Sequence, residues 1–320
     1  MTDLPLRLGV IGLGAMGAEM LAIAVAHPDV TVELAADPSE AAIQRARIAN
    51  PAVAFTNDPM AVIARTDIDA VYIAAPPTTH AHYAIAAMKS GKAVFCEKPL
   101  AVDLTEGEEM VAVAAATGLV NALNYTLSDR SAAVEVLRAV RAGEPGDILS
   151  VDMQFLFPEW PREFQKEARW VAGREQGGFL REVGSHYVFL TDRVLGPLTR
   201  VHTEVSYGAD GETETTATGL FSASGIPVGL SGNVAAGPET YAWTLYGSRR
   251  SYRITSWGDL SIGDASGWQP VPLTGPRGGE DTRLAEFVGA VRGRLSTPTL
   301  ADFGAGLRVQ RAIEAFHTAG

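Results

Sequence analysis

An acid and an imidazole four residues apart form the first pair in this chain whose types and spacing could do chemistry. They are Glu182 and His186 in the stretch REVGSH, just after a Gly-Gly pair. On a helix, residues i and i+4 lie on one face, so both side chains can point into the same space. An imidazole can exchange a proton with a substrate hydroxyl near neutral pH, and a carboxylate one turn earlier can orient it. The alternative is a pair of merely structural neighbours.

A glycine-rich turn near the N-terminus is the second chemical signal. Gly12, Gly14 and Gly17 form G-x-G-x-x-G directly after an apolar strand pattern and at the opening of a helical pattern. The first glycine allows a tight turn, the second lets the backbone approach a pyrophosphate, and the third lets helix and strand pack closely. The helix N-terminus then faces the anion. The predicted dinucleotide-binding loop comprises Gly12, Leu13, Gly14, Ala15, Met16 and Gly17.

An acidic residue at the end of the second predicted strand bears on which dinucleotide binds. Asp37 lies twenty residues past Gly17, where a carboxylate can bind both hydroxyls of an adenosine ribose. Its charge would repel a 2′-phosphate, and neither Pro38 nor Ser39 supplies a cation beside it. NAD is therefore the predicted cofactor, with NADP as the alternative. The competing interpretation makes Asp37 the N-cap of the helix that begins at PSEAAI.

Short apolar runs alternate with helical patterns over the first 125 residues, as they do in βαβ units. The predicted strands are LRLGVIGLG, TVELAAD, DAVYIAA, AVFCEK and LVNALNY. Runs that are apolar throughout are typical of strands buried on both faces of a parallel sheet. The pattern predicts an α/β fold with a doubly wound parallel sheet, a Rossmann domain over residues 1–124.

The predicted helices of this region have recognisable ends. Asp58 and Pro59 are predicted as N-cap and first helical residue, and Thr105 with Glu108 as a capping box. Two glycines, Gly91 and Gly118, occupy the places of residues that follow a helix C-terminus. Such ends support the alternation of strands and helices.

The pattern changes after a predicted helix near residues 129–143. The runs DILSVDMQFLF, TRVHTEVSY, TTATGLFSAS, PVGLSGNVAA and ETYAWTLYGS are strand-length, with alternating or β-branched character and turn residues between them. They predict a second α+β domain, residues 125–320, with a large, mainly antiparallel open sheet. One helix near residues 179–195 interrupts the strands, and helices near 282–294 and 304–319 close the chain. The last helix is assigned to this second domain, and the alternative is that it packs back on the first domain.

Composition limits the partners of the protein. Of the 320 residues, 47% are hydrophobic and 20% charged, which is the usage of a folded globular chain. A formal charge of −11 without a basic cluster argues against nucleic acid or an anionic membrane and leaves a small-molecule partner. The single cysteine, Cys96, predicts no internal disulfide and no metal cluster, and a reducing cytoplasm fits it best. The apolar stretch of residues 8–26 contains five glycines or acids and is interpreted as soluble structure.

With this fold expected, the stretch TTHAHYAIAAMKSGKAVFCEKPL resembles the signature segment of the Gfo/Idh/MocA oxidoreductase family. In that family, a helix ending in Gly-Lys leads to a strand and then to Glu-Lys-Pro. The stretch GGFLREVGSHYVFLTDRVLG is similar to the family's second motif, and GAGLRVQRAIEAFHTA is similar to its closing helix. The resemblance extends over nearly the whole chain.

The resemblance implies roles for the residues around Glu-Lys-Pro. Lys98 corresponds to the active-site lysine, with a Lys98–Pro99 peptide that is often cis and Glu97 supporting the turn. An ammonium at this place can stabilise alkoxide charge and take part in proton transfer. Pro76, Pro77 and His80 would lie in the loop near the nicotinamide, with His80 expected to order that loop rather than to catalyse.

The resemblance also makes Glu182 and His186 catalytic candidates, and it has two departures. Family members usually carry aspartate at the place of Glu182 and often a second aspartate where this chain has Phe189. These departures leave the usual sugar or inositol substrate less certain than the fold. Candidate substrate contacts in the aromatic segment before this helix, and after the last strand of the first domain, are Trp160, Arg162, Trp170 and Tyr125.

The predicted function is hydride transfer between a nicotinamide cofactor and a carbon that bears a hydroxyl or carbonyl group in a small molecule such as a sugar or polyol. In this hypothesis Lys98 polarises the oxygen, His186 relays the proton and Glu182 orients, although lysine and histidine could exchange roles. Alternatives within the family are imine reduction, NAD-assisted lyase or glycosidase chemistry, and a dinucleotide sensor without activity. The family also implies a homodimer or homotetramer formed through the open face of the second sheet.

Overall fold

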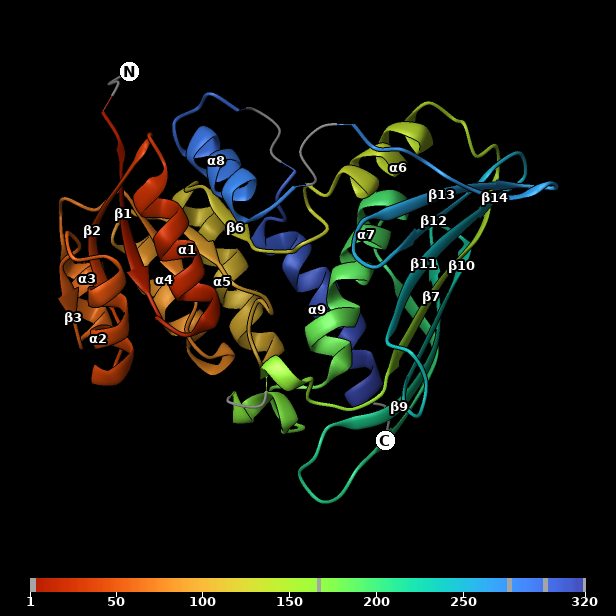
Figure 1. The fold of residues 1–320 in the computed structure, drawn as a ribbon, viewed down its shortest axis with the longest axis horizontal. Coiled ribbons are helices and arrows are strands. Elements are labelled where there is room, and N and C mark those ends of the chain that lie inside the picture. The colour runs from red at the N-terminus through yellow and green to blue at the C-terminus, as the bar shows by residue number, and fades with distance from the viewer. Residues whose placement is uncertain (1–3, 166–167, 275–277, 296–298, 319–320) are drawn as a thin grey trace. The chain divides into compact units, whose positions relative to one another are not determined.

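A computed structural model describes residues 4–165, 168–274, 278–295 and 299–318 (Figure 1). The chain forms two compact units. The first comprises Met1–Tyr125 and Gly278–Leu307, and the second comprises Thr126–Arg277 and Arg308–Gly320. Each unit has its own β-sheet.

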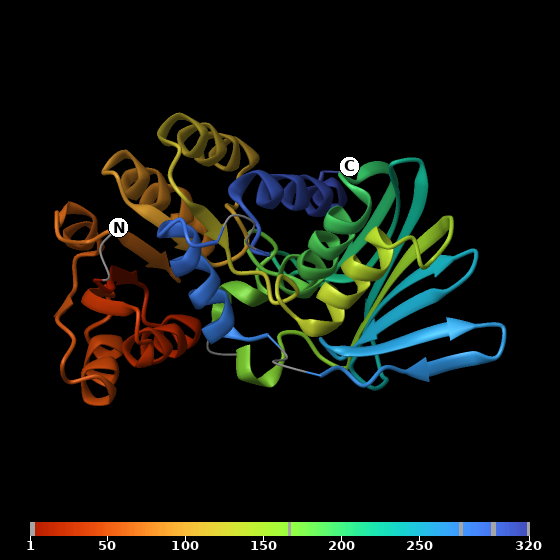
Figure 2. The ribbon, with the colours of Figure 1, turned by 90° about the horizontal axis from the view of Figure 1, so that it is seen from above.

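The sheet of the first unit is six-stranded and parallel, with the order β3-β2-β1-β4-β5-β6. Its strands are β1 (Leu6–Ile11), β2 (Val30–Ala36), β3 (Phe55–Thr56), β4 (Ala70–Ile73), β5 (Ala93–Cys96) and β6 (Asn121–Leu123). The helices of this unit are α1 (Ala15–Ala26), α2 (Glu40–Ala49), α3 (Pro59–Ala64), α4 (His80–Lys89), α5 (Leu104–Thr117) and α8 (Glu280–Val291). They cover both faces of the sheet (Figures 1 and 2). The predicted doubly wound Rossmann architecture is confirmed.

The central strands of this sheet are buried on both faces, as their apolar runs predict. Every residue of β4 and of β5 is buried, including Tyr72 and Cys96. Because strands of a parallel sheet end at the same edge, the loops after β1, β4 and β5 come together there, at the place where the strand order reverses. This edge carries the predicted cofactor residues.

The helix ends confirm most of the sequence reading and correct one prediction. Asp58 caps α3 through a hydrogen bond from the backbone N–H of Met60, and Gly118 follows α5 with a φ of 64°. The predicted Thr105 and Glu108 capping box is wrong. Instead Asp103 caps α5, and its carboxylate accepts from the backbone N–H of Thr105 at 2.7 Å. An aspartate two residues earlier reaches the first-turn donors and displaces the threonine from that place.

The sheet of the second unit is eight-stranded, in the order β14-β13-β12-β11-β7-β10-β9-β8. Its strands are β7 (Ile148–Phe157), β8 (Thr199–Tyr207), β9 (Glu214–Ala223), β10 (Ile226–Val234), β11 (Thr240–Gly247), β12 (Ser251–Thr255), β13 (Asp259–Asp264) and β14 (Gly267–Pro270). Only the β7 and β10 pair is parallel among the described ladders of this sheet, so the prediction of a mainly antiparallel sheet is confirmed. Strands β12 to β14 had no counterpart in the sequence reading.

Helices pack on one face of this second sheet. They are α6 (Ser131–Arg141), α7 (Ser185–Leu195) and the greater part of α9 (Phe303–His317) (Figures 1 and 2). Side chains alternate accordingly along β9, where Ala217 and Phe221 are buried while Thr218 and Leu220 are exposed. The opposite face, on which no described helix packs, is therefore mixed in character along β9, with more hydroxyl than apolar groups.

The division between residues 1–124 and 125–320 into cofactor and substrate domains stays a prediction, and the compact units differ from it mainly near the C-terminus. Helix α8, which the prediction placed in the second domain, belongs to the first unit and packs with α1. The start of α9 also belongs to the first unit, where the backbone N–H of Phe303 donates to Asn121 at 2.8 Å. From Arg308 onward the helix belongs to the second unit.

None of the described helices is long and apolar enough to cross a membrane. The N-terminal apolar stretch is instead divided between β1, the glycine turn and α1.

Candidate active site

The glycine loop has the shape that a pyrophosphate requires. Gly12 has a φ of 94°, and a Cβ there would lie 2.4 Å from the carbonyl oxygen of Ala74. A Cβ on Gly17 would lie 2.0 Å from the carbonyl oxygen of Gly12, so both glycines are required by close backbone packing. Gly14, in contrast, faces open space and is exposed at the N-terminus of α1. The exposed backbone and the helix N-terminus fit a dinucleotide phosphate group.

Asp37 lies beside this loop and not on the following helix. Its Oδ2 accepts from the backbone N–H of Leu13 at 2.7 Å, and its Oδ1 accepts from that of Ser39 at 2.8 Å. The helix α2 is capped by Ser39, whose hydroxyl accepts from the N–H of Ala42. The N-cap interpretation of Asp37 is therefore wrong, and its carboxylate is held against the glycine loop.

His80 connects the two loops that follow β4 and β5. Its imidazole is buried, with Nδ1 2.8 Å from the carbonyl oxygen of Pro99 and Nε2 2.9 Å from that of Ala75. Burial lowers the pKa of this imidazole below its ordinary value, although both hydrogen bonds act in the opposite direction. With both nitrogens engaged by the backbone, His80 has the geometry of a loop-ordering residue. Pro76 and Pro77 begin the turn that leads to it.

Lys98 lies two residues after the end of β5, and the Lys98–Pro99 peptide is cis. The lysine is partly exposed, and its charge acts on both Glu97 and His80. An ammonium at the carboxyl end of a strand beside the switch point of the sheet is suitably placed to donate to a substrate oxygen.

Glu97 is embedded in a hydrogen-bonded network behind Lys98. Its Oε1 accepts from the hydroxyl of Tyr72 at 2.5 Å and from the side-chain amide of Asn124 at 2.6 Å. The same amide nitrogen donates to Glu280 at 2.6 Å, and the Asn124 oxygen accepts from Nε of Arg283 at 2.6 Å. The pKa of Glu97 is raised to about 7. Burial is the largest cause, and the negative charge of Glu280 is the second. The sequence reading assigned Glu97 to the turn but found none of these partners.

Glu182, the acid of the second motif, lies in the irregular first turn of a helix in the second unit. Residues Leu180–Gly184 form a π-helical turn that continues into α7. Buried Glu214 accepts from the backbone N–H of Leu180 at 2.7 Å, and a Cβ on Gly178 would lie 2.2 Å from its carboxylate. Gly178 of the Gly-Gly pair thus leaves space for Glu214, whose carboxylate binds the N–H at the helix start. Burial raises the pKa of Glu214.

Glu182 is linked to the predicted substrate arginine through one amide. Its Oε2 accepts from Nε2 of Gln165 at 3.2 Å, and Oε1 of Gln165 accepts from Nε of Arg162 at 2.8 Å. The Arg162 side chain is 15% exposed and lies over the rings of Trp160 and Phe164, with centroid distances of 5.4 and 4.6 Å. Burial lowers the pKa of Arg162, whereas nearby carboxylates raise it. Glu182, Trp160 and Arg162 are therefore brought together.

His186 is 5% exposed, and its Nδ1 accepts from the backbone N–H of Thr126 at 3.0 Å. A tryptophan that the sequence reading missed closes the other side of the ring. Trp257 packs edge-on against His186, with ring centroids 5.2 Å apart and planes at 89°. The indole also contacts the rings of Tyr187 and Tyr241. These contacts give the histidine a fixed orientation.

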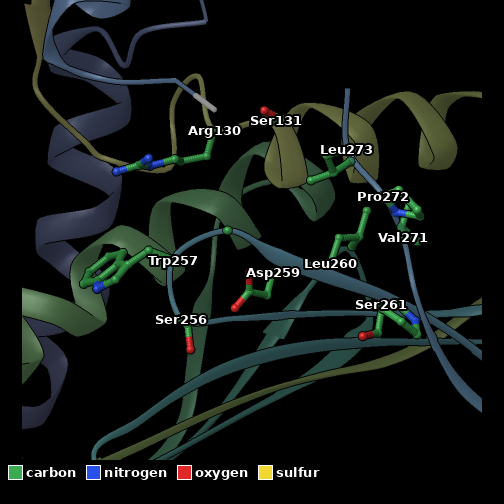
Figure 3. Close-up of a pocket in the computed structure, with 12 residues that line it drawn as sticks. Arg130, Ser131, Ser256, Trp257, Asp259, Leu260, Ser261, Val271, Pro272 and Leu273 are labelled. Atoms are coloured by element: carbon green, nitrogen blue, oxygen red, sulfur yellow. The ribbon is translucent and has the colours of Figure 1, made fainter. Parts of the chain in front are cut away.

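Trp257 also lies at one end of a cavity of about 610 Å³ in the second unit. The cavity is formed by the start of α6, the turn between β12 and β13, and residues 270–273 (Figure 3). Arg130 and Trp257 lie at the same end, while Leu260 and Leu273 give the other end an apolar lining (Figure 3). The cavity therefore borders the tryptophan that contacts His186.

The remaining predicted residues lie in different settings. Trp160 is half-buried against Phe157 and Phe179, and Trp170 is half-buried in a short 3₁₀ turn. Tyr125 is 1% exposed and belongs to the first unit with Lys98. Glu182 and His186 belong to the second unit.

Two family models match the chain in order. Residues 6–125 match the model described as "Oxidoreductase family, NAD-binding Rossmann fold", and residues 134–253 match that described as "GFO/IDH/MocA C-terminal domain". Both belong to one family of oxidoreductases, and they match the two successive parts expected of it.

Named proteins that are similar to this chain are also oxidoreductases. A dTDP-3,4-didehydro-2,6-dideoxy-alpha-D-glucose 3-reductase from Streptomyces violaceoruber is 29% identical over 270 residues, 83% of this chain and 76% of the relative. Inositol 2-dehydrogenase 2 of Paenarthrobacter aurescens is 38% identical over 122 residues, 36% of each chain. A 3-ketoreductase from Actinomadura kijaniata, solved with NADP and TDP-benzene, has the same fold, with a TM-score of 0.82, 21% identity, and coverage of 98% of this chain and 97% of that one. The glycine loop, the loop that carries Lys98 and the matches to both family models lead to one conclusion. The chain belongs to the Gfo/Idh/MocA family of NAD(P)-dependent oxidoreductases.

Proposed function

We propose that the protein oxidises or reduces a hydroxyl or carbonyl carbon of a sugar, a polyol or a related cyclic molecule. The observation that carries the proposal is the edge of the first sheet, where the glycine loop, Asp37 and Lys98 follow the parallel strands β1, β2 and β5. A cofactor held by the first two would present its ring near the third. When bound, the nicotinamide supplies or accepts the hydride.

The proposed roles of the chain's own residues follow from their chemistry. Lys98 and His186 serve the substrate oxygen that gains or loses a proton, and Glu182 orients the substrate near them. Holding these groups in place makes the reaction effectively unimolecular, and charge that develops on the oxygen is stabilised by hydrogen-bond donors.

The substrate class is proposed from the named relatives and from the cluster around Glu182. The Streptomyces violaceoruber relative reduces a dTDP-linked keto sugar, and the Paenarthrobacter aurescens relative is an inositol dehydrogenase, as their names state. Glu182 and Gln165 offer polar partners for hydroxyl groups, and Arg162 offers a cation for an acidic group. A cyclic, hydroxylated substrate, with or without an acidic substituent, fits this set.

A direct assay tests the proposal. Purified protein is mixed with NAD(H) or NADP(H) and with polyols, inositols, free sugars, dTDP- and UDP-linked sugars, and cyclic imines, and the absorbance of the reduced nicotinamide is followed. Accumulation or loss of reduced cofactor with a hydroxylated substrate supports the proposal. Turnover of a glycoside without any net change in that absorbance would indicate a non-redox reaction, and turnover of imines alone would move the activity to another substrate class.

We further propose a homodimer or homotetramer that acts in the cytoplasm. The face of the second sheet opposite α6, α7 and α9 has no described helix on it (Figure 2), and strand residues such as Leu220 are exposed there. The only cysteine of the chain, Cys96, is buried and free, as suits a reducing compartment. Light scattering at micromolar concentration tests the assembly, and a monomeric mass would refute it.

A further inference from the structure

A lysine occupies a place after α4 where a hydrophobic residue is common. The helix ends in a Schellman motif, in which the N–H of Gly91 donates to the carbonyl of Met88 at 2.9 Å. In the same motif the N–H of Lys92 donates to the carbonyl of Ala87 at 3.0 Å. The residue after the glycine often packs its side chain on the last turn of the helix. Here that residue is Lys92, and it is only 4% exposed.

The Lys92 ammonium has no protein partner in the part of the chain that the structure describes. None of the described residues forms a hydrogen bond or an ion pair with it. Lys89, three residues earlier, is in contrast exposed and pairs with Glu109 at 3.6 Å. An ammonium that is withdrawn from water is costly unless a negative or hydrogen-bonding group compensates its charge. Lys92 therefore needs a partner that the described side chains do not supply.

Lys92 lines a cavity of about 420 Å³ at the amino edge of the first sheet. The cavity lies between the end of α3, the loop that precedes β4 and the turn that follows α4. Because the strands of this sheet are parallel, this edge is opposite to the one that carries the glycine loop and Lys98. The cavity lies within the first unit and is separate from the proposed active site. Its volume suits a small organic molecule better than a single ion.

The polar groups of the cavity favour a ligand with a single negative charge. The hydroxyls of Thr66 and Ser90 line it with Lys92 and can donate to an anion. Among the described lining residues the acid is Asp69, and both of its oxygens are engaged by Arg7. Oδ2 accepts from the backbone N–H and from Nε at 3.0 Å each, and Oδ1 accepts from Nη2 at 2.5 Å. Lys92 can thus compensate one negative charge, and a second one would be repelled by Asp69.

An apolar wall completes the cavity. Ile63 and Ile68 line it and are each 3% exposed, and Ala64 lines it at the exposed end of α3. A bare phosphate has no group to place against this wall. We infer that the cavity binds a small aliphatic carboxylate, with the carboxylate on the Lys92 ammonium and the chain against Ile63 and Ile68. This inference does not depend on the proposed function.

The ligand class is tested by NMR on the whole protein, with sodium butyrate as the probe. The chain has only four lysines, so labelling them with ¹³C at Cε gives four signals. The Lys92 signal is the one that disappears in Lys92→Met, and the Lys89 signal is assigned in the same way. At constant ionic strength we expect butyrate to shift the Lys92 signal, with half-saturation at roughly 1 to 10 mM. The signal of exposed Lys89 should stay nearly unchanged.

Three variants test the site by thermal unfolding with and without butyrate. Butyrate at about 50 mM should raise the Tm of wild type by roughly 1 to 4 °C. Lys92→Met keeps the length of the side chain but removes its charge, and it should lose this rise. Lys89→Met is the matched control and should keep it. Ala64→Phe places a ring in the cavity while Lys92 is retained, and it should weaken butyrate binding at least about tenfold even if Lys92→Met does not fold.

Three further ligands identify what the cavity recognises. Butyramide has the same chain without the charge and should leave the Lys92 signal unchanged. Tighter binding of inorganic phosphate than of butyrate, or an equal effect of sodium chloride, would overturn the assignment of a carboxylate. A Lys92 signal that does not move up to about 100 mM butyrate would overturn the site itself. None of these measurements involves hydride transfer, so they stand or fall separately from the proposed function.

Discussion

The carboxylate of Asp37 accepts a hydrogen bond from the backbone N–H of Leu13, with 2.7 Å between the oxygen and the nitrogen. The contact joins the end of β2 to the glycine loop. Since Ser39 caps α2, the carboxylate is not required to stabilise the helix terminus. We propose that this carboxylate selects between cofactors that differ only in a ribose phosphate.

Replacing Asp37 is expected to shift cofactor preference. A unit charge about 4 Å away contributes about 1 to 4 kcal/mol, depending on the effective dielectric constant. Asp37→Ala should therefore raise the ratio of kcat/KM for NADP to that for NAD by about tenfold or more. Glu40→Gln, which removes an exposed carboxylate three residues later, is the control and should leave the ratio nearly unchanged. Steady-state kinetics with both cofactors measure the ratio, and an equal shift in both variants would mean that only net charge matters.

Replacing Lys98 tests the proposed proton donor. Positioned proton transfer and charge stabilisation each contribute typically 10² or more to the rate. Lys98→Met should lower kcat by roughly 10²-fold or more at saturating cofactor and substrate. The matched control is Lys89→Met, because Lys89 is exposed at the end of α4 and pairs with Glu109. Turnover in Lys98→Met within a few-fold of wild type would exclude the lysine from the chemistry.

The network around Glu97 predicts how stability depends on pH. The pKa of Glu97 is raised from 4.5 to about 7 in the folded protein, so its contribution to stability is fully present below pH 4.5 and lost as the pH rises through 7. Glu97→Gln removes this ionisation while its amide oxygen still accepts from Tyr72. The difference in free energy of unfolding, variant minus wild type, should therefore increase by on the order of 2 to 3 kcal/mol as the pH rises from 5 to 8.5.

Urea unfolding at both pH values measures the gain, and Glu135→Gln is the control. Glu135 is on the exposed side of α6, where it pairs with Arg138. Its replacement should give nearly the same difference from wild type at pH 5 and pH 8.5. A difference for Glu97→Gln that does not change with pH would show that the carboxyl keeps its ordinary pKa.

The architecture and part of the candidate site could be predicted from the sequence. Apolar runs with glycine and proline boundaries determine the strands of the first unit, and the glycine spacing has few structural meanings after a strand. The partners of Glu97 were not predictable, because Glu280 is 183 residues away along the chain and meets it only through the fold. Trp257 was missed because the residues that have positive φ in its turn, Ser256 and Trp257, are not glycines. Strands β12 and β14 are only five and four residues long, too short for a clear alternating pattern.

A buried ion pair between the second motif and the last helix predicts a large loss of stability. Arg181 donates to both carboxylate oxygens of Glu314 at 2.8 and 2.9 Å, and the two side chains are 8% and 13% exposed. Removing one partner of a buried pair leaves an uncompensated charge and costs about 3 to 5 kcal/mol. Arg181→Met should lose about that much in the free energy of unfolding. Arg138→Met, which breaks more exposed pairs, should lose no more than about 1 kcal/mol. Equal losses would show that burial of the pair is unimportant.

The indole of Trp257 is expected to matter for activity more than for folding. It packs on His186, Tyr187 and Tyr241, so its removal frees the imidazole and opens the adjoining cavity. Trp257→Gly removes the indole and suits the φ of 66°, which offsets part of the lost packing. We expect kcat/KM to fall by about tenfold or more, because a misplacement near 1 Å at a reacting centre costs up to about 10²-fold.

The matched control is Trp268→Gly. Trp268 lies on β14 beneath the guanidinium of Arg253, at 4.0 Å from its ring centroid, and has no described contact with His186. Its loss should leave kcat/KM within about twofold, as expected for a substitution away from the reacting groups. Kinetics and thermal unfolding of both variants separate activity from stability. If Trp257→Gly unfolds at a much lower temperature but turns over normally where it is folded, the indole serves the packing of the second unit and is not needed to orient His186.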